Sequence, residues 1–360
     1  MDIVAEENRL PKGSSLAVKR LGLSDTVMAR RWDDFVLHQC ADATFFHRSA
    51  WQEIVANVFR HSTYFFYAER EGQIEGVLPL AHVKSMLFGN SLVSLPFAVY
   101  GGVAASNSEA AGVLENEAQS LARRLGVDHL ELRNFNQRHV DWPTQDLYVY
   151  FRKAIDPDVE ANMLAIPRKQ RAMVRKGIKN GLRSEIDDNV DRFFSLYASN
   201  VLRHGTPAMP KRYFERLLQV FEKDCEVLTV IDPQGQPVSS VLSFYFRDEI
   251  LPYYAGDAVA ARDLAGNDFK YWELMRRSCE RGIRIFDYGR SKQGTGSYSF
   301  KKNWGFEPKP LYYEHCLYRR DGIPQNNPSN AKYRLFIEAW RRLPVGFANW
   351  LGPFIVRNLG

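Results

Sequence analysis

The chain has 360 residues, of which 45% are hydrophobic and 25% are charged, and this balance excludes a largely disordered protein. A chain of this length predicts two domains or one large domain. The net charge of +6 favours anionic partners such as phosphates, nucleic acid or a membrane surface, without choosing among them.

The metal-ligating residue types follow no recognised motif. The 4 cysteines are scattered singly, and the 8 histidines form neither an HExxH nor an HxxxH pair. We therefore expect no metal site, and a reducing compartment is the simpler interpretation of the cysteines. The start, Met1 to Glu7, is acidic and has no apolar core, and no run of 18 apolar residues occurs. The sequence thus predicts a cytoplasmic protein.

The first half of the chain shows an ordered series of elements. Residues 65–78 read as strand, turn and strand, and Leu95 to Gly102 follow as a Pro- and Gly-containing segment. A helix is predicted from Glu109 to Leu125, where Gly126 ends it, and residues 129–133 read as a further strand.

The second half repeats this series. Residues 227–238 read as strand, turn and strand, Leu251 to Gly256 follow, a helix is predicted over 268–281, and residues 283–288 read as a strand. The spacing from Pro96 to Gly126 is 30 positions, the same as from Pro252 to Gly282. Matching order and spacing indicate two copies of one α/β unit.

We divide the chain into a first domain over 1–155, a second over 156–320 that carries the candidate site, and a helical tail over 321–360. The tail contains a predicted helix over 332–342 and an apolar stretch over 345–359 that is too short to span a bilayer, flanked by Arg341, Arg342 and Arg357. Docking of this tail on its own protein is one interpretation; peripheral contact with the inner face of a membrane is the other.

A basic helix is predicted after Pro167 and ends near Asn180-Gly181. Arg171, Arg175 and Lys179 recur every four residues and form one cationic stripe, next to an apolar stripe of Val174, Ile178 and Leu182. Such a helix can hold a phosphate or an RNA backbone, and a solvated surface helix is the alternative.

A glycine-rich segment over 286–306 runs from a strand through a loop into a short helix. It is not a P-loop, because Thr295 stands where that motif requires lysine. Its small residues and cations predict a site for an anion or a developing oxyanion. The cations are Arg290, Lys292, Lys301 and Lys302.

Three further acidic and basic residues are candidates. Asp257 follows Tyr254-Ala255-Gly256 at a strand end and could orient or deprotonate an amine, or merely cap a turn. Arg203 could grip a phosphate or end a surface helix. For Asp287, bonding to the loop backbone is the favoured interpretation.

The combined pattern resembles the Fem-type (FemAB) branch of the GNAT-like N-acyltransferases, over about residues 40–320. The segments that carry the resemblance are 95–102, the basic helix, Tyr254-Ala255-Gly256, 287–291 and, most specifically, 296–305 with Phe300-Lys301-Lys302. Within that branch the chain is most similar to the Gram-negative subgroup found with exosortase (PEP-CTERM) and exopolysaccharide systems.

The resemblance implies an α/β (α+β) fold of tandem GNAT-like domains with mixed sheets flanked by helices. It implies acyl transfer to an amine of a small molecule or a cell-envelope precursor. Acyl-CoA and aminoacyl-tRNA are both candidate donors, so tRNA is a candidate partner. It places Lys301 at the reaction centre and matches Arg203 to an arginine that contacts substrate phosphate.

The predicted function is therefore direct attack of an amine on the donor carbonyl. Lys301 would stabilise the oxyanion, Tyr254 would position substrate, and Asp257 or a water would take the proton. Arg203, Arg290, Arg171, Arg175, Lys179 and Lys302 would bind substrate. The alternative is a degenerate acyltransferase that binds RNA or an envelope precursor without turnover.

Overall fold

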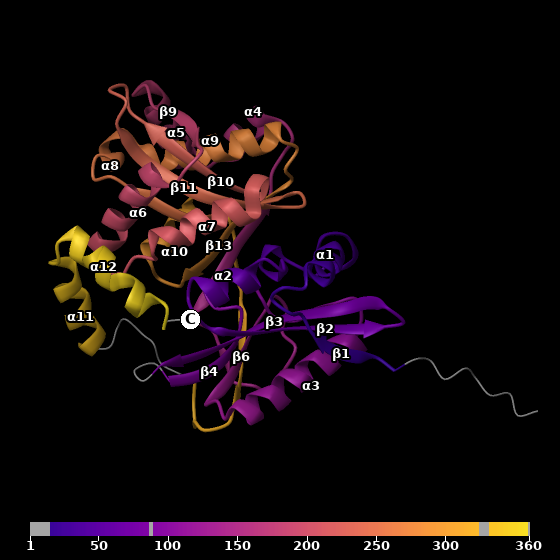
Figure 1. Ribbon diagram of the computed structural model, residues 1–360. Helices are drawn as coiled ribbons and strands as arrows, with labels where there is room; N and C mark the ends of the chain where they lie inside the picture. The colour runs from indigo at the N-terminus through magenta and orange to yellow at the C-terminus, as the bar shows by residue number, and fades with distance from the viewer. Residues whose placement is uncertain (1–14, 86–88, 324–330, 359–360) are drawn as a thin grey trace, which may run out of the picture.

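The computed structural model describes residues 15–85, 89–323 and 331–358, which form two lobes built on separate sheets (Figure 1). The acidic start, Met1 to Glu7, lies outside the described residues. None of the described helices combines the length and the apolarity needed to cross a membrane.

The sheet of the first lobe has the strand order β1-β2-β3-β4-β6-β15-β7, with β5 paired to β3. Its strands are β1 (Ala17–Arg20), β2 (Ser62–Arg70), β3 (Gln73–Ser85), β4 (Gly89–Ser94), β5 (Ala104–Ala105), β6 (His129–Asn134), β7 (Thr144–Gln145) and β15 (Tyr312–Leu317). Its helices are α1 (Thr26–Asp34), a π-helix (Phe35–Gln39), a 3-10 helix (Phe45–His47), α2 (Trp51–Asn57) and α3 (Ser108–Leu125).

The sheet of the second lobe has the order β14-β8-β13-β12-β11-β10-β9. Its strands are β8 (Tyr148–Ala154), β9 (Arg183–Asp187), β10 (Cys225–Ile231), β11 (Pro237–Phe246), β12 (Glu249–Asp257), β13 (Ile285–Lys292) and β14 (Pro308–Pro310). Its helices are α4 (Val159–Ala165), α5 (Arg168–Lys179), α6 (Asp191–Arg203), α7 (Lys211–Phe221), a 3-10 helix (Glu222–Asp224), α8 (Ala261–Leu264), α9 (Gly266–Glu280) and α10 (Gly296–Asn303).

The predicted internal repeat is confirmed. In each lobe a meander of three antiparallel strands leads into a helix and then into a strand that pairs in parallel with the third strand of the meander. These units are β2-β3-β4-α3-β6 and β10-β11-β12-α9-β13. Gly126 adopts a φ of +60° at the end of α3, a left-handed conformation that glycine tolerates.

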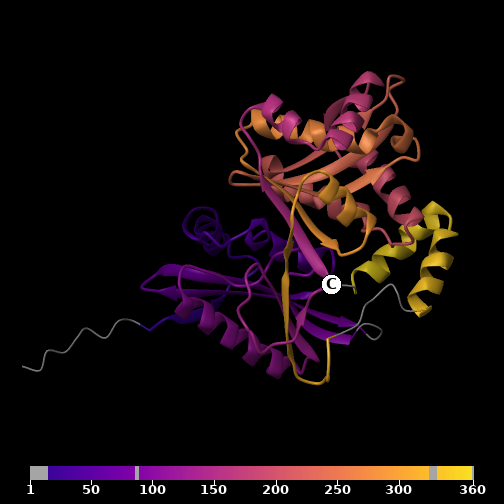
Figure 2. The ribbon, with the colours of Figure 1, turned by 180° about the vertical axis from the view of Figure 1, so that it is seen from behind.

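The two lobes exchange strands. β8 precedes the second repeat in the sequence, but it pairs with β13 and β14 of the second sheet. β15 follows the second repeat, but it pairs with β6 and β7 of the first sheet. In Figure 2 the orange β15 runs down from the second lobe into the first. The chain therefore crosses from the first lobe to the second before β8 and returns to the first before β15.

An aromatic core joins the lobes. Phe45 stacks on Phe244 with 4.3 Å between ring centroids, and Trp51 lies 5.3 Å from Phe221. All four side chains are buried in one cluster that spans both lobes. Because burial of aromatic area is a large stabilising term, this core fixes how the lobes meet.

The tail forms α11 (Ala331–Arg341) and α12 (Val345–Val356), which pack against α6 (Figure 1). Trp340 and Ala348 are buried in one cluster with Leu202. Gly352 lies so close to the backbone of Ala208 that a Cβ there would be 3.0 Å from its carbonyl oxygen. The tail thus docks on its own protein, as the first interpretation of its pattern predicts.

Candidate functional site

A cavity of about 530 Å³ lies where the two lobes and the tail meet. Most of its lining comes from the second lobe. Phe97, Val99 and Arg133 contribute from the first lobe, and Val356 contributes from α12. The cavity is therefore a product of the whole chain, and the docked tail forms part of its wall.

The cavity opens where β12 and β13 separate. These parallel strands pair only at Glu249 with Ile285 and at Ile250 with Phe286. Beyond those positions both strands continue, to Asp257 and Lys292, without pairing to each other. Facing strand edges that do not pair can hydrogen-bond an extended chain carrying amide groups.

Both strands are bulged where they separate. Tyr253 is the extra residue of β12 opposite β11, and Tyr288 is the extra residue of β13 opposite β8. Pro252 has no N–H, and proline inside a sheet is confined to edges and bulges. Gly289 has a φ of +61°, which completes the turn of the β13 bulge. The bulges redirect the backbone and place both tyrosine rings in the cavity lining.

Lys301 lies on α10 and lines this cavity with only 9% of its surface exposed. Its ammonium donates to the carbonyl oxygens of Tyr288 at 2.7 Å, Arg290 at 3.0 Å and Gly289 at 3.3 Å. Burial lowers the pKa of Lys301 to about 7, and the nearby Arg290 adds to this effect while Asp287 opposes it. The ammonium and the neutral amine are therefore both populated near neutral pH.

Two guanidinium groups accompany Lys301 in the cavity lining. Arg290 donates to the hydroxyl of Tyr313 at 3.3 Å and lies 4.4 Å from the ring centroid of Tyr148. Arg133 donates to the carbonyl oxygen of Ala98 at 2.8 Å and lies 5.3 Å from the ring centroid of Tyr313. Sequence reasoning missed Arg133, because it lies within a strand of the first lobe and carries no local motif.

The described lining contains no carboxylate, although Arg133, Arg290 and Lys301 all contribute to it. The rest is mainly aromatic, apolar and hydroxyl-bearing. A cationic cavity walled by rings suits a ligand that carries both a phosphate or carboxylate group and an apolar or planar part.

Tyr254 lines the cavity and contacts Tyr213, with 3.0 Å between the two hydroxyl oxygens. Burial raises the pKa of Tyr254 well above its usual value, so its hydroxyl stays protonated. Tyr254 is thus suited to donate or accept a hydrogen bond and not to act as a base.

The first-lobe wall of the cavity has an unusual backbone. Leu95 and Phe97 have φ values of +49° and +68°, a region that residues with a Cβ seldom adopt. The carbonyl oxygen of Phe97 accepts a hydrogen bond of 2.8 Å from Tyr253. Backbone held in this region clusters at functional sites, which fits the place of the Leu95-Pro96-Phe97 segment beside the cavity.

Asp257 and Arg203 are not among the residues that line the cavity. The carboxylate of Asp257 accepts from the ammonium of Lys270 at 3.0 Å and from the hydroxyl of Ser239. Lys270 is fully buried. Arg203 donates to the backbone carbonyl of Asp257 and to the side chain of Asn200.

The predicted basic helix is α5, and its cations also lie outside the cavity lining. Arg175 and Lys179 are exposed, and Arg171 donates to the carbonyl of Leu164 at 3.3 Å. The predicted apolar stripe is partly wrong, because Ile178 is 50% exposed. The helix meets α9 through Val174 and Gly177, where a Cβ would lie 2.8 Å from the Cβ of Phe269.

The remaining candidates, Lys302 and Asp287, are not among the residues that line the cavity. Lys302 is exposed near the ring of Tyr298. Asp287 is buried and accepts from the backbone N–H of Gly289 at 2.6 Å, which matches its favoured interpretation as a loop-bonding residue. Burial raises the pKa of Asp287 to about 6. The structure therefore brings Lys301, Arg290 and Tyr254 together and places the other predicted residues elsewhere.

Comparison with known proteins gives the fold a name. Residues 168–302 match the family model described as an acetyltransferase (GNAT) domain. The solved structure of FemX covers 84% of this chain and 98% of its own, with a TM-score of 0.62 at 15% identity. A tandem GNAT protein from the clavulanic acid biosynthesis pathway covers 84% and 98%, with a TM-score of 0.50 at 12% identity. The chain thus has the expected tandem GNAT fold.

Two further proteins are similar to this chain. A putative lysylphosphatidylglycerol synthetase from Agrobacterium fabrum is similar through its C-terminal domain, with a TM-score of 0.55 at 14% identity, covering 81% of this chain and 91% of that one. The UDP-N-acetylmuramoylpentapeptide-lysine N(6)-alanyltransferase of Weissella viridescens is 24% identical over 103 residues, or 28% of this chain. That match spans only 31% of the alanyltransferase.

Proposed function

We propose that this chain is an N-acyltransferase that moves an acyl or aminoacyl group from an activated donor to an amine. The observation that carries the proposal is the buried ammonium of Lys301 in a cationic cavity at the separation of β12 and β13. The GNAT domain match and the partial similarity to an alanyltransferase support the same class of reaction.

The proposed reaction is a direct attack. The amine lone pair forms a bond to the donor carbonyl carbon, and the carbonyl electrons move onto oxygen. Collapse of this intermediate expels the thiolate or alkoxide of the donor, and the nitrogen loses a proton. The described lining contains no histidine and no cysteine, and a covalent enzyme intermediate is not part of the proposal.

Lys301 is proposed to stabilise the oxyanion. Donors fixed in a water-poor site before reaction are the most effective stabilisers of developing charge. Its N–H groups already point to three carbonyl oxygens, of which the one at Gly289 is the longest at 3.3 Å. We propose that the oxyanion takes over this weakest contact. Since the described residues of the lining include no carboxylate, a water is the proposed proton acceptor and not Asp257.

The proposed donor is acyl-CoA or aminoacyl-tRNA, both of which carry phosphate. Arg290 and Arg133 would hold an anionic group, and the facing edges of β12 and β13 would bind an extended amide chain. The proposed acceptor is an amine of a cell-envelope precursor. The assignment to the Gram-negative subgroup found with exosortase (PEP-CTERM) and exopolysaccharide systems stays a prediction.

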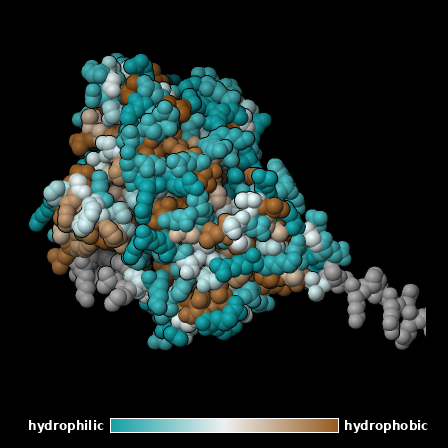
Figure 3. Space-filling view, in the orientation of Figure 1, coloured by the Kyte–Doolittle hydropathy of each residue, from teal (hydrophilic) through white to brown (hydrophobic). Residues whose placement is uncertain are grey.

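We further propose a peripheral membrane contact through the tail. The outer face of α11 and α12 exposes a cluster of apolar side chains, with Trp350 63% exposed (Figure 3). Arg341, Arg342 and Arg357 are exposed beside it, and this combination suits an anionic lipid surface. We call the exposed apolar side chains of α11 and α12 the tail patch. It consists of Leu335, Phe336, Val345, Phe347, Trp350 and Phe354.

A second candidate function is binding without turnover. It is favoured by the full use of the Lys301 N–H groups on backbone carbonyls, which is what a purely structural lysine would show. The experiment that separates the two is mass spectrometry of ligands retained on the purified protein, followed by turnover assays with the identified donor and a panel of amines. Retention with product formation supports the transferase, and retention without product supports the binding module.

A further inference from the structure

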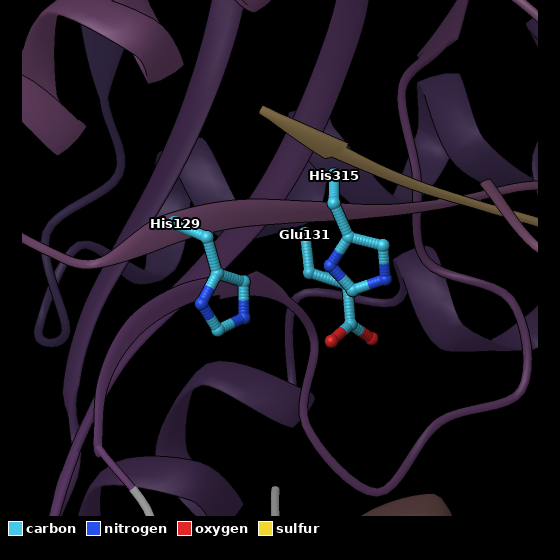
Figure 4. Close-up of side chains that lie close together, drawn as sticks. All are labelled: His129, Glu131 and His315. Carbon is cyan, nitrogen blue, oxygen red and sulfur yellow. The ribbon is translucent and has the colours of Figure 1, made fainter. Parts of the chain in front are cut away.

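We propose that His129, Glu131 and His315 bind one divalent transition-metal ion of the zinc class, which joins β6 to β15. Each residue offers one ligand atom, and these atoms lie within 4.8 Å of one another (Figure 4). This cluster is separate from the cavity described above, because none of the three residues lines it.

The strand register explains why the three side chains meet. His129 and Glu131 are two residues apart on β6, so their side chains emerge on the same face of the sheet. His315 on β15 lies directly opposite Glu131 in the antiparallel pair. Leu130 and Leu132 point to the other face, where they pack with α3. A sheet thus holds all three ligands without any loop.

A second observation is that ring nitrogens of both histidines are buried without hydrogen-bond partners among the described residues. His315 is 3% exposed and His129 is 6% exposed. Both ring nitrogens of His315 and Nδ1 of His129 are buried without a hydrogen-bond partner among the described residues. Buried polar atoms are nearly always paired, since leaving one unpaired destabilises the fold. A metal ion bound at these nitrogens would satisfy them.

An ion pair with Arg133 fixes the carboxylate of Glu131 in place. Arg133 donates to Oε1 of Glu131 at 2.7 Å, and the carboxylate has a second oxygen to offer.

Two imidazoles and one carboxylate form a donor set that zinc and related first-row ions prefer. Metal–ligand bonds of about 2.0–2.2 Å would require the side chains to draw together slightly from their present separation. Three protein ligands leave a further position for water. The ion would fasten the strand that arrives from the second lobe to the sheet of the first.

The test uses the full chain, stripped with a chelator and then titrated with Zn²⁺ or Co²⁺. We expect one equivalent to bind, a rise in the unfolding temperature, and a Co²⁺ absorption spectrum typical of nitrogen and oxygen ligands. A His315→Ala variant should raise the Kd by about 100-fold or more, since even residues that only support a ligand are worth 10–100-fold. His82→Ala, on β3 of the same sheet and separated from β6 by β4, is the matched control and should bind normally.

Should His315→Ala fail to fold, His315→Gln and His129→Gln keep a similar volume and test the same ligands. No binding by the wild-type chain, or equal binding by wild type and both Gln variants, would overturn the proposal and leave a water as the group that satisfies these nitrogens. A Co²⁺ spectrum with thiolate bands would likewise overturn it, because it would assign the ion to a free cysteine such as Cys316.

Discussion

The ammonium of Lys301 lies 2.7 Å from the carbonyl oxygen of Tyr288, and it reaches that oxygen because Tyr288 is the extra residue of the bulge in β13. The bulge turns consecutive carbonyls toward α10, and the lysine binds three of them. One side chain therefore both fixes the shape of the separated strand and places a charge in the cavity.

Replacing Lys301 by methionine should reduce kcat by about 100-fold or more, because removal of one oxyanion donor has effects of 10²–10³ in other enzymes. The fold should persist, since methionine keeps the apolar stem and removes a buried charge. Turnover assays and circular dichroism measure the two effects. Lys302→Met, one residue along and exposed, is the matched control and should retain turnover. Equal activity of both variants would remove Lys301 from the mechanism.

The pH profile distinguishes two roles for Lys301. Its pKa of about 7 means that raising the pH through 7 converts the ammonium to the neutral amine. If the ammonium stabilises the oxyanion, kcat should fall by about tenfold per pH unit above 7. If the neutral amine accepts a proton instead, kcat should rise by about tenfold per pH unit below 7 and level off above 7. The inflection should vanish in Lys301→Met, and an inflection that persists there would belong to another group.

Variants of the exposed cations of α5 should distinguish a tRNA donor from an acyl-CoA donor. Changing Arg171, Arg175 and Lys179 together to glutamine should weaken binding of a tRNA donor and lower its salt dependence, by about one unit of slope per lost phosphate contact. An acyl-CoA donor that fits the cavity should be unaffected, since none of the three residues lines it. Binding titrations at several salt concentrations give the answer. Lysine-to-glutamine changes at Lys19 and Lys309, both exposed and distant from α5 in sequence, serve as the control.

The tail patch should mediate vesicle binding. Changing Phe347, Trp350 and Phe354 to serine should reduce flotation with phosphatidylglycerol vesicles by about tenfold or more, through lost apolar burial. The control changes Leu23, Val140 and Val259 to serine, because these are also exposed but lie elsewhere in the chain. Flotation of the wild type with neutral vesicles alone would contradict the electrostatic part of the proposal. Absence of flotation with any vesicle would refute the contact.

Local patterns predicted much of the fold. The repeated order of strands, turns and helix, with its equal Pro-to-Gly spacing, predicted both α3 with β6 and α9 with β13. The strand exchange of β8 and β15 had no local signal, because pairing partners far apart in sequence are set by how the lobes pack. For the same reason no spacing rule could connect His315 with His129 and Glu131.

The sequence predicted the site residues that stand in a basic, glycine-rich segment. It could not predict the surroundings of residues whose contacts come from distant parts of the chain. Lys301 and Arg290 stand in a glycine-rich basic segment. Arg133 enters the cavity from the other lobe and has no such context. Asp257 follows Gly256 at a strand end, as a catalytic residue often does, but the sequence could not show that Lys270 on α9 pairs with its carboxylate.

Variants of Asp257 distinguish a structural role of its carboxylate from a catalytic role. Its carboxylate pairs with the fully buried ammonium of Lys270 at 3.0 Å. Asp257→Asn would leave that ammonium without its counter-charge, and breaking a buried pair costs roughly 3–5 kcal/mol, with the lower end expected here because Asp257 is partly exposed. Urea unfolding should show this loss, while kcat per folded molecule should stay within about twofold if water is the proton acceptor.

The double variant Asp257→Asn with Lys270→Met supplies the control, because it removes both partners and should recover part of the lost stability. Recovered stability with normal turnover would assign the pair a structural role. A large fall in kcat in the single and the double variant alike, with the stability of the double variant restored, would instead return Asp257 to the mechanism as the group that takes the proton. The comparison works because stability follows the buried pair, whereas catalysis would follow the carboxylate alone.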